Sequence, residues 1–393
     1  GSEMCIRDSY KSGTGSGGMV NAPYVTNITD SLKEDGTVQV NEVLEAQYRE
    51  WLKDHPFDIG EGWAMEPWNQ EEMPVSEELA RQAAEQSDLA IVVLGRTAGE
   101  DKDNSAAEGS YLLTAAEEEI LRNVCNAFVR TIVVLNVGNI MDMKWVDRYQ
   151  PQAVLYVWQG GQEGGRATVD VLTGKVNPGG KLSDTIAEDI EDYPSTENFG
   201  DPVENFYTED IYVGYRYFET IPGAQEKVVY PFGYGLSYTT FTLDTTAMWE
   251  TEDQIFAEVQ VTNTGDMAGK EVVQLYFEAP QGILKKPSRQ LAAFAKTRLL
   301  QPGETQLIRL AFAKADMASY DDLGKIQKSA YILEKGTYKF FIGTSVRNTE
   351  EGIQTMELSH NIITRQLTAH MVPSSLKERM LSDGTVSYTH LTL

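Results

Sequence analysis

Residues 89–113 are LAIVVLGRTAGEDKDNSAAEGSYLL. They begin with an apolar, largely β-branched run from Leu89 to Leu94, which predicts a strand buried on both faces of a sheet. Gly95 then leads into a loop that carries Arg96, Glu100, Asp101, Asp103 and Glu108. In an open parallel sheet, ligands and chemistry gather just beyond the carboxyl ends of the strands. This charged loop is therefore the first candidate for a functional site.

The segments around this stretch alternate between helix and strand patterns. Helical spacing of apolar residues predicts helices over 23–35, 41–54 and 76–86. Thr114 and Glu117 form a capping box that begins a further helix, which we expect to end near Phe128. Buried strands are predicted at Thr131–Asn136 and Ala153–Trp158, with a short helix through 167–172. This order implies a parallel sheet between helices joined by right-handed crossovers.

The pattern changes in the second half of the chain. Aromatic residues crowd positions 206–241, which we interpret as the closing wrap of the first domain. Alternating apolar residues then predict short strands over 255–262, 271–277, 305–312 and 337–343, an arrangement typical of a β-sandwich. After residue 346 only Leu376–Leu381 suggests an element, a helical stretch. The expected fold class is a mostly parallel α/β domain followed by an all-β domain.

Composition excludes several classes of function. The 393 residues carry a net charge of -26, which disfavours nucleic acid because its binding depends on basic side chains. The two cysteines, Cys5 and Cys125, cannot build a disulfide framework. No apolar run approaches the ~18 residues of a membrane span. No signal peptide is visible, which predicts a cytoplasmic location.

Both ends of the chain, GSEMCIRDS and VSYTHLTL, fit no pattern in their surroundings and resemble translated adapter sequence.

Motifs narrow the possible chemistry. The chain has no HExxH, no CxxC and no cluster among its four histidines, so no metal site is expected. It has no G-x-S-x-G elbow and no Walker loop. The glycines at 13–18 loosely resemble a dinucleotide fingerprint, but no strand precedes them, and a flexible loop is the alternative interpretation.

Carboxylates remain as candidates for catalysis. A glycosidase needs two of them, a proton donor and a nucleophile or base, flanking the scissile bond. Glu100 follows the buried strand, and flanking carboxylates with closure by a partner domain would tend to raise its pKa toward the acid role. The alternative from composition alone is a solvated acidic loop.

An ordered series of motifs resembles a known family. The pieces are AIVVLGRTAGED at 90–101, GQEGG at 161–165, VDVLTG at 169–174, NPGGKL at 177–182 and PFGYGLSYTTF at 231–241. Together they resemble the second domain of glycoside hydrolase family 3, the β-glucosidase family. Residues 250–345, with NTG at 263–265 and GKEVVQLY at 269–276, are similar to the fibronectin type III-like domain that follows it in this family.

The resemblance implies a retaining, exo-acting β-glycosidase that hydrolyses terminal non-reducing β-D-glucosyl residues of β-linked oligosaccharides or glucosides. In this family a TIM-like barrel supplies the aspartate nucleophile, and the α/β domain supplies the acid/base glutamate on the loop after this strand. The matching pair here is Gly99-Glu100, so the resemblance assigns the catalytic role to Glu100. Arg96 and Asp103, on the same loop, are candidates for substrate binding. No metal or organic cofactor is implied.

The sequence also departs from the family. The barrel and its Ser-Asp-Trp nucleophile motif are missing, and Ser183-Asp184-Thr185 is no substitute. Some members place the barrel last, and this chain fits such a permuted enzyme cut before its barrel. The expected segments are non-native residues 1–9, the α/β sandwich domain 10–242, the fibronectin-like sandwich 243–346, a linker toward the barrel 347–385, and non-native residues 386–393. The alternative is a non-catalytic carbohydrate-binding or interaction module.

Overall fold

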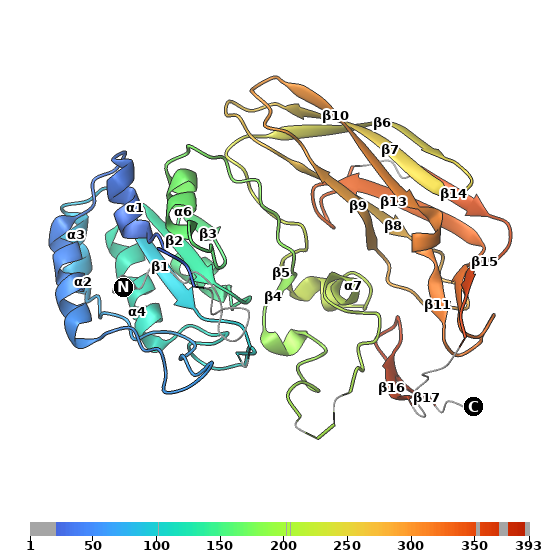
Figure 1. Ribbon diagram of the computed structural model, residues 1–393, viewed down its shortest axis with the longest axis horizontal. Helices are drawn as coiled ribbons and strands as arrows, with labels where there is room; N and C mark the ends of the chain where they lie inside the picture. The colour runs from blue at the N-terminus through green and yellow to red at the C-terminus, as the bar shows by residue number, and fades with distance from the viewer. Residues whose placement is uncertain are drawn as a thin grey trace. The chain divides into compact units, whose positions relative to one another are not determined.

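The structure is a computed structural model that describes residues 21–100, 102–201, 203–204, 206–350, 354–368 and 376–389. The chain forms two compact units, Gly1–Val176 and Asn177–Leu393 (Figure 1). The domain boundary predicted near residue 243 stays a prediction. The glycines at 13–18 and the predicted non-native residues 1–9 lie outside the described ranges. Within those ranges, no helix combines the length and apolar character needed to cross a membrane.

The first unit alternates helices and strands as the sequence predicts. Its elements are α1 (Ile28–Asp35), α2 (Glu42–Asp54), α3 (Glu77–Ala84), β1 (Ala90–Arg96), α4 (Ala115–Ala127), β2 (Thr131–Val137), α5 (Lys144–Tyr149), β3 (Ala153–Tyr156) and α6 (Gly164–Leu172). The predicted capping box at α4 is confirmed, since Glu117 N–H donates to the Thr114 hydroxyl and the Glu117 carboxylate accepts from Thr114 N–H.

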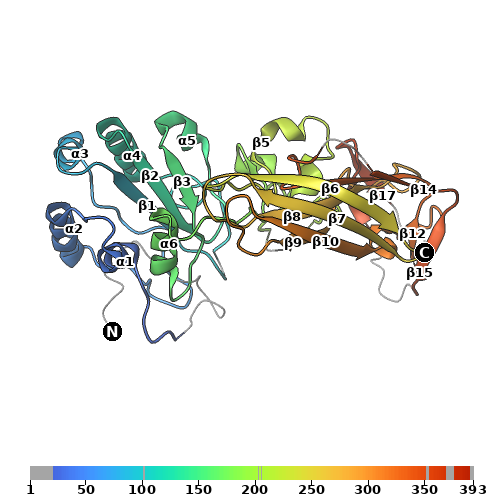
Figure 2. The same cartoon turned by 90° about the horizontal axis from the view of Figure 1, so that it is seen from above.

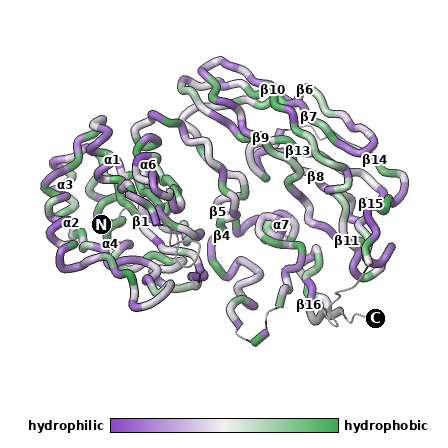
Figure 3. The backbone as a smooth tube through the Cα atoms, viewed as in Figure 1, coloured by the Kyte–Doolittle hydropathy of each residue, from purple (hydrophilic) through white to green (hydrophobic). Residues whose placement is uncertain are grey.

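The three strands form one parallel sheet in the order β1–β2–β3. Figure 2 shows α4 and α5 on one face of this sheet and α1 and α6 on the other. The α1 and α6 face is closed by Ile28, Leu32 and Val169 packing on Val134. Burial on both faces explains the continuous apolar strands, which Figure 3 shows as hydrophobic segments at the centre of this unit. The predicted α/β class is therefore confirmed for this unit.

The second unit begins with short elements and continues into strands. Its elements are β4 (Ile186–Ala187), η1 (Ile190–Asp192), α7 (Tyr215–Phe218), η2 (Ala224–Lys227), β5 (Val228–Tyr230), β6 (Phe241–Glu250), β7 (Gln254–Asn263), β8 (Val272–Glu278), β9 (Gln290–Lys296), β10 (Thr305–Ala313), η3 (Lys314–Met317), β11 (Ser319–Asp321), β12 (Ala330–Leu333), β13 (Gly336–Gly343), β14 (Gln354–Leu358), β15 (Ile362–Gln366), β16 (Leu376–Met380) and β17 (Val386–Thr389).

Two antiparallel sheets, ordered β10–β7–β6 and β14–β13–β8–β9, form the predicted β-sandwich. Their inner faces share one core, in which Val259, Leu275, Leu310 and Phe340 are buried. Part of the segment predicted as a linker also belongs to the sheets, because β14 pairs with β13 and β15 pairs with β12.

The aromatic segment that the sequence assigns to the first domain lies in the second unit. Tyr215 stacks on Phe232 at a ring-centroid distance of 4.5 Å. Its hydroxyl accepts a hydrogen bond of 2.9 Å from the backbone N–H of Leu291 in the sandwich. Tyr276, also in the sandwich, meets the Tyr215 ring edge-on. These rings therefore pack against the sandwich strands.

The helix predicted for Leu376–Leu381 is wrong, because residues 376–380 form β16, which pairs with β17. The turn between them explains the difference: Gly384 has a φ of +83°, and the Asp383 side chain accepts from Thr385 N–H. Met380 is buried with Tyr212, a non-local contact that favours the extended strand. Residues 386–389, predicted to be non-native, supply the partner strand.

Asp321 supports a stability prediction in this unit. Its buried carboxylate accepts four backbone hydrogen bonds of 2.7–3.0 Å, from the N–H groups of residues 324 to 327. Burial opposes the charge, but the four donors outweigh it and lower the pKa of Asp321. Asp321→Asn removes acceptor capacity, so we expect a loss of about 1–3 kcal/mol at neutral pH, measured by urea unfolding of this chain.

The same experiment at acid pH tests the cause. A carboxyl with a lowered folded pKa stabilises the fold above its unfolded pKa of about 3.9, and this stabilisation is lost as pH falls through the folded pKa. The difference between wild type and Asp321→Asn should therefore shrink below about pH 4. Asp266→Asn, at an exposed turn position, is the matched control and should change little. A pH-independent difference would contradict a role for the ionised carboxylate.

Candidate functional site

The carboxyl ends of β1, β2 and β3 meet at one edge of the parallel sheet, and the loops that follow them fit closely together. Gly138, directly after β2, shows how closely: a Cβ added there would lie 2.4 Å from the Ala98 Cβ and 2.7 Å from Nε2 of Gln159. Only glycine fits between those two loops. The edge that the sequence predicts to be functional is therefore a packed platform built from all three strands.

Glu100 lies on the loop after β1 and is exposed to solvent. It follows Gly99, whose φ of +129° is in a region that residues with a Cβ rarely adopt. This turn lets the chain leave the strand sharply. Asp101 is outside the described residues. An exposed carboxyl at the end of a buried strand can meet a ligand, which is the first requirement of a proton donor.

Arg96 is placed differently from a loop residue. It is the last residue of β1, and its side chain is 3% exposed. Its guanidinium forms a two-pronged ion pair with the fully buried carboxylate of Glu117 on α4, with 2.7 Å between Nη2 and Oε2. The Arg96 side chain therefore points into the first unit. Because it is almost fully buried, it offers no exposed group for the predicted contact with substrate.

This ion pair ties together the two ends of the loop that carries Glu100. Arg96 also donates to the carbonyl oxygens of Ser110 at 3.2 Å and Leu112 at 3.3 Å. Glu117 at the same time accepts 2.8 Å from Thr114 N–H, at the start of α4. The outgoing and returning ends of the loop are therefore both fixed to one buried ion pair at the edge of the sheet.

The middle of the loop is joined to the segment after β2. The Asn139 amide donates to the Lys102 carbonyl oxygen at 3.2 Å, and the Asn104 amide donates to the Ile140 carbonyl oxygen at 2.8 Å. Asp103, between these two anchors, and Glu108, after them, are both exposed. Asp103 therefore shares a surface loop with Glu100, and its predicted contact with substrate stays a prediction.

The glycines of GQEGG have a structural role. A Cβ at Gly165 would lie 2.4 Å from the Asn27 carbonyl oxygen, so α6 can approach the segment before α1 only with glycine there. Hydrogen bonds from Thr26 N–H to the Gln162 carbonyl oxygen and from Gly165 N–H to the Thr26 hydroxyl hold the contact. The motif thus closes one face of the sheet.

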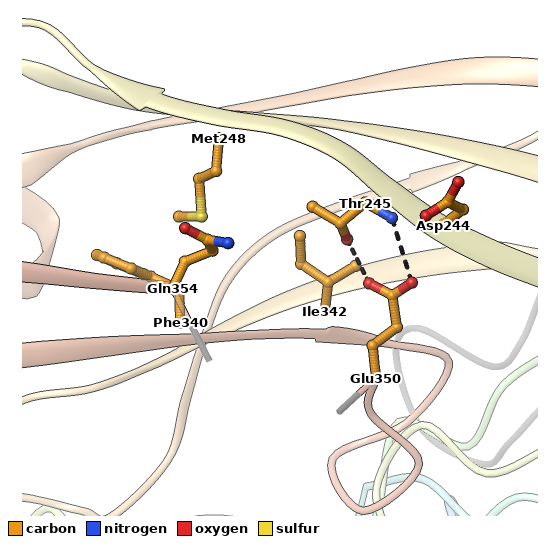
Figure 4. A pocket seen from close by; sticks show the side chains of 7 residues that line it. All are labelled: Asp244, Thr245, Met248, Phe340, Ile342, Glu350 and Gln354. Carbon is orange, nitrogen blue, oxygen red and sulfur yellow. Dashed lines mark hydrogen bonds between the residues drawn. The ribbon is translucent and has the colours of Figure 1, made fainter. Parts of the chain in front are cut away.

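A hollow of about 180 Å³ lies in the second unit, between β6 and the strands β13 and β14. Figure 4 shows Glu350 directed at Thr245, whose backbone N–H donates to it at 3.2 Å, with Met248 beside Phe340. Ligand pockets usually measure about 300–1,000 Å³, so this hollow is small for a sugar site. The Glu350 carboxylate is occupied in holding the edge strand β6.

Among the residues that the structure describes, no group of three or more His, Cys, Asp and Glu is arranged to hold a metal ion. Sequence reasoning missed the pairing of Arg96 with Glu117. One signal was available: Glu117 interrupts the apolar face of a helix, and a fully buried carboxylate requires a basic partner. The identity of that partner, 21 residues earlier, could not be found from local pattern.

Comparison with known proteins supports the motif series. A family profile described as the glycosyl hydrolase family 3 C-terminal domain matches residues 5–238. A second profile, the fibronectin type III-like domain, matches residues 271–346. The two matches fall in the order that the sequence predicts for the α/β and sandwich regions.

Individual relatives agree with these profiles. A beta-glucosidase of Ruminococcus albus is 48% identical over 375 residues, which are 95% of this chain and 39% of the relative. Beta-glucosidase A of Butyrivibrio fibrisolvens is 45% identical, over 96% of this chain and 50% of the relative. The chain therefore spans half or less of the length of these curated relatives.

Solved structures show the same likeness. A beta-glucosidase from Paenibacillus barengoltzii superposes with a TM-score of 0.90 at 49% identity, covering 98% of this chain and 43% of that one. Beta-glucosidase 3B from Thermotoga neapolitana, solved in complex with glucose, gives a TM-score of 0.81 at 34% identity, covering 90% of this chain and 49% of that one.

Proposed function

Because the chain belongs to glycosyl hydrolase family 3, we propose that it supplies the acid/base half of a retaining, exo-acting β-glycosidase. The proposed substrates are β-linked oligosaccharides and glucosides, cleaved at terminal non-reducing β-D-glucosyl residues. The observation that carries this proposal is the position of Glu100, exposed on an anchored loop at the carboxyl edge of the parallel sheet. The beta-glucosidase names of the similar proteins support the substrate class.

The proposed mechanism divides two carboxyl groups between two domains. In a retaining glycosidase they stand about 5–5.5 Å apart across the glycosidic bond. A barrel aspartate would attack the anomeric carbon while the Glu100 carboxylic acid gives its proton to the leaving oxygen. Glu100 would then take a proton from water, which attacks the glycosyl-enzyme and releases the sugar. The relatives are twice as long as this chain or longer, which leaves room in them for a barrel.

The platform at the sheet edge suits the proton donor. An acid must be held within hydrogen-bond reach of the leaving oxygen through both steps, since small misplacements weaken proton transfer. The Arg96–Glu117 pair fixes the ends of the loop, and the asparagine contacts fix its middle. The exposed carboxyl is thus presented from a rigid base toward whatever covers this edge. A cytoplasmic location remains a prediction from the sequence.

This chain alone should not hydrolyse aryl β-glucosides. Half of the carboxyl pair is missing, so no glycosyl-enzyme can form. The measurement is release of 4-nitrophenol from 4-nitrophenyl β-D-glucoside by the purified chain, with Glu100→Gln as the paired variant. Turnover that Glu100→Gln abolishes would contradict the division of the site between two domains. Tight binding of cello-oligosaccharides by calorimetry, without turnover, would favour the carbohydrate-binding alternative.

A further inference from the structure

The segment between α2 and α3 contains a closed loop, Asp58–Gln70. Its neck is held by the Gln70 side chain, which is 3% exposed. The Gln70 amide donates to the Asp58 carbonyl oxygen at 3.0 Å and accepts from Asp58 N–H at 2.8 Å. A buried amide that satisfies both backbone groups of one residue makes a rigid closure.

The loop is also packed within itself. Gly60 has a φ of +72°, and a Cβ there would lie 2.3 Å from the Met65 carbonyl oxygen, so only glycine fits. The Asp58 carboxylate accepts 2.8 Å from Gly60 N–H. Compact surface loops that are packed in this way frequently carry function.

The tip of this rigid loop exposes apolar side chains. Ile59 is 65% exposed, Trp63 53% and Met65 61%. Single exposed apolar residues are ordinary, but three on one loop whose shape is fixed form a surface suited to contact. Trp63 offers the largest ring, and its indole N–H provides a polar group at the edge.

The returning half of this loop packs against the loop that carries Glu100. Thr97 N–H donates to the Trp68 carbonyl oxygen at 2.9 Å, and the Thr97 hydroxyl bonds the Glu66 carboxylate at 3.2 Å. The Lys102 ammonium lies 5.7 Å from the centre of the Trp68 ring. Figure 1 shows this segment, in blue between α2 and α3, passing the end toward which β1 points. The two loops therefore form one surface at the sheet edge.

The proposed chemistry says which part of a substrate meets this surface. The acid gives its proton to the oxygen that joins the two sugars, and the nucleophile approaches from the opposite side of the anomeric carbon. Groups that surround the acid on its own domain are therefore on the side of the leaving group. A β-linked sugar presents its axial C–H bonds on a flat face, and the negative face of an aromatic ring attracts such polarised hydrogens.

From these contacts, and resting on the proposed glycosidase function, we propose that Trp63 is a platform for the leaving-group sugar. The Asp58–Gln70 loop that carries this indole packs, through Glu66 and Trp68, against the start of the Glu100 loop. Met65 and Ile59 are further exposed apolar side chains of the same loop. Trp63 thereby sets a preference for oligosaccharides over glucosides with small leaving groups.

The test compares two substrates of a family 3 enzyme that contains this chain together with a barrel domain. Cellobiose places a glucose on the leaving-group side, whereas β-glucosyl fluoride places only fluoride there. For Trp63→Ala, kcat/KM for cellobiose should fall about tenfold further than kcat/KM for β-glucosyl fluoride, chiefly through KM. Trp63→Phe keeps a ring and should recover most of the loss. Trp249→Ala, an exposed tryptophan on the sandwich, is the matched control and should leave the ratio unchanged.

The possible outcomes test the Trp63 platform and the proposed glycosidase function separately. A wild-type protein that hydrolyses neither substrate overturns the proposed glycosidase. A wild type that hydrolyses both, with an unchanged ratio in Trp63→Ala, overturns the platform alone. An equal fall for both substrates in Trp63→Ala also overturns it, because that result marks the loop as a contact with another part of the protein.

Discussion

In a family 3 enzyme that contains this chain, Glu100→Gln should lower kcat/KM for alkyl and unactivated aryl β-glucosides by about 10²–10⁴-fold, the usual contribution of a positioned general acid. Glutamine has nearly the same shape but cannot transfer the proton that a poor leaving group needs. The loss should therefore grow with the pKa of the leaving group and become small for 2,4-dinitrophenyl β-glucoside. A series of aryl glucosides measured with wild type and variant gives this dependence directly.

The pH profile gives a second readout of the same substitution. An essential acid makes kcat/KM fall on the alkaline side, because the carboxyl loses the proton it must donate. In Glu100→Gln this alkaline limb should disappear for substrates with good leaving groups. Glu108→Gln changes an exposed carboxyl on the same loop and serves as the control. Full activity of Glu100→Gln on poor leaving groups would rule out Glu100 and make Glu108 and Asp103 the next residues to test.

Glu117→Ala should be the most destabilising of the substitutions considered for the first unit. It leaves the Arg96 guanidinium buried with no carboxylate partner, and breaking a buried pair from one side costs about 3–5 kcal/mol. It also removes the acceptor for Thr114 N–H at the start of α4. Urea unfolding of this chain at neutral pH measures the loss of free energy of unfolding.

Two further variants test whether the loss of stability in Glu117→Ala comes from the buried ion pair. Glu119→Ala is on the same helix, where the carboxylate is exposed and lies 3.9 Å from Arg122, so the loss should stay within about 0.5 kcal/mol. Arg96→Met combined with Glu117→Leu replaces both charges by apolar groups and should regain much of the stability. Equal losses for Glu117→Ala and Glu119→Ala would refute the assignment of the pair as a buried anchor.

The sequence predicted what depends on local pattern. The buried runs became β1, β2 and β3 because short runs rich in β-branched residues favour strands that are buried on both faces. Thr114 and Glu117 began α4 because a capping box satisfies donors within four residues. The alternating segments of the second half became sandwich strands for the same kind of local reason.

The sequence failed where a distant partner decides. Arg96 looked like a loop residue that could meet substrate, and only the carboxylate of Glu117, on the next helix, draws it into the interior. Leu376–Leu381 is too short for periodicity to separate helix from strand, and pairing with β17 settled it. The closure of the Asp58–Gln70 loop depends on one buried amide, the Gln70 side chain, which no local pattern marks.

The order β1–β2–β3 has a consequence for the handling of this chain. Among the described residues, β1 and β3 each pair with β2 alone, so each has an outer row of N–H and C=O groups with no strand partner. Such rows are templates for strand addition. A further strand from elsewhere in a longer protein would complete the sheet there, and so would a second copy of this chain. We therefore expect edge-to-edge association of this chain to increase with protein concentration.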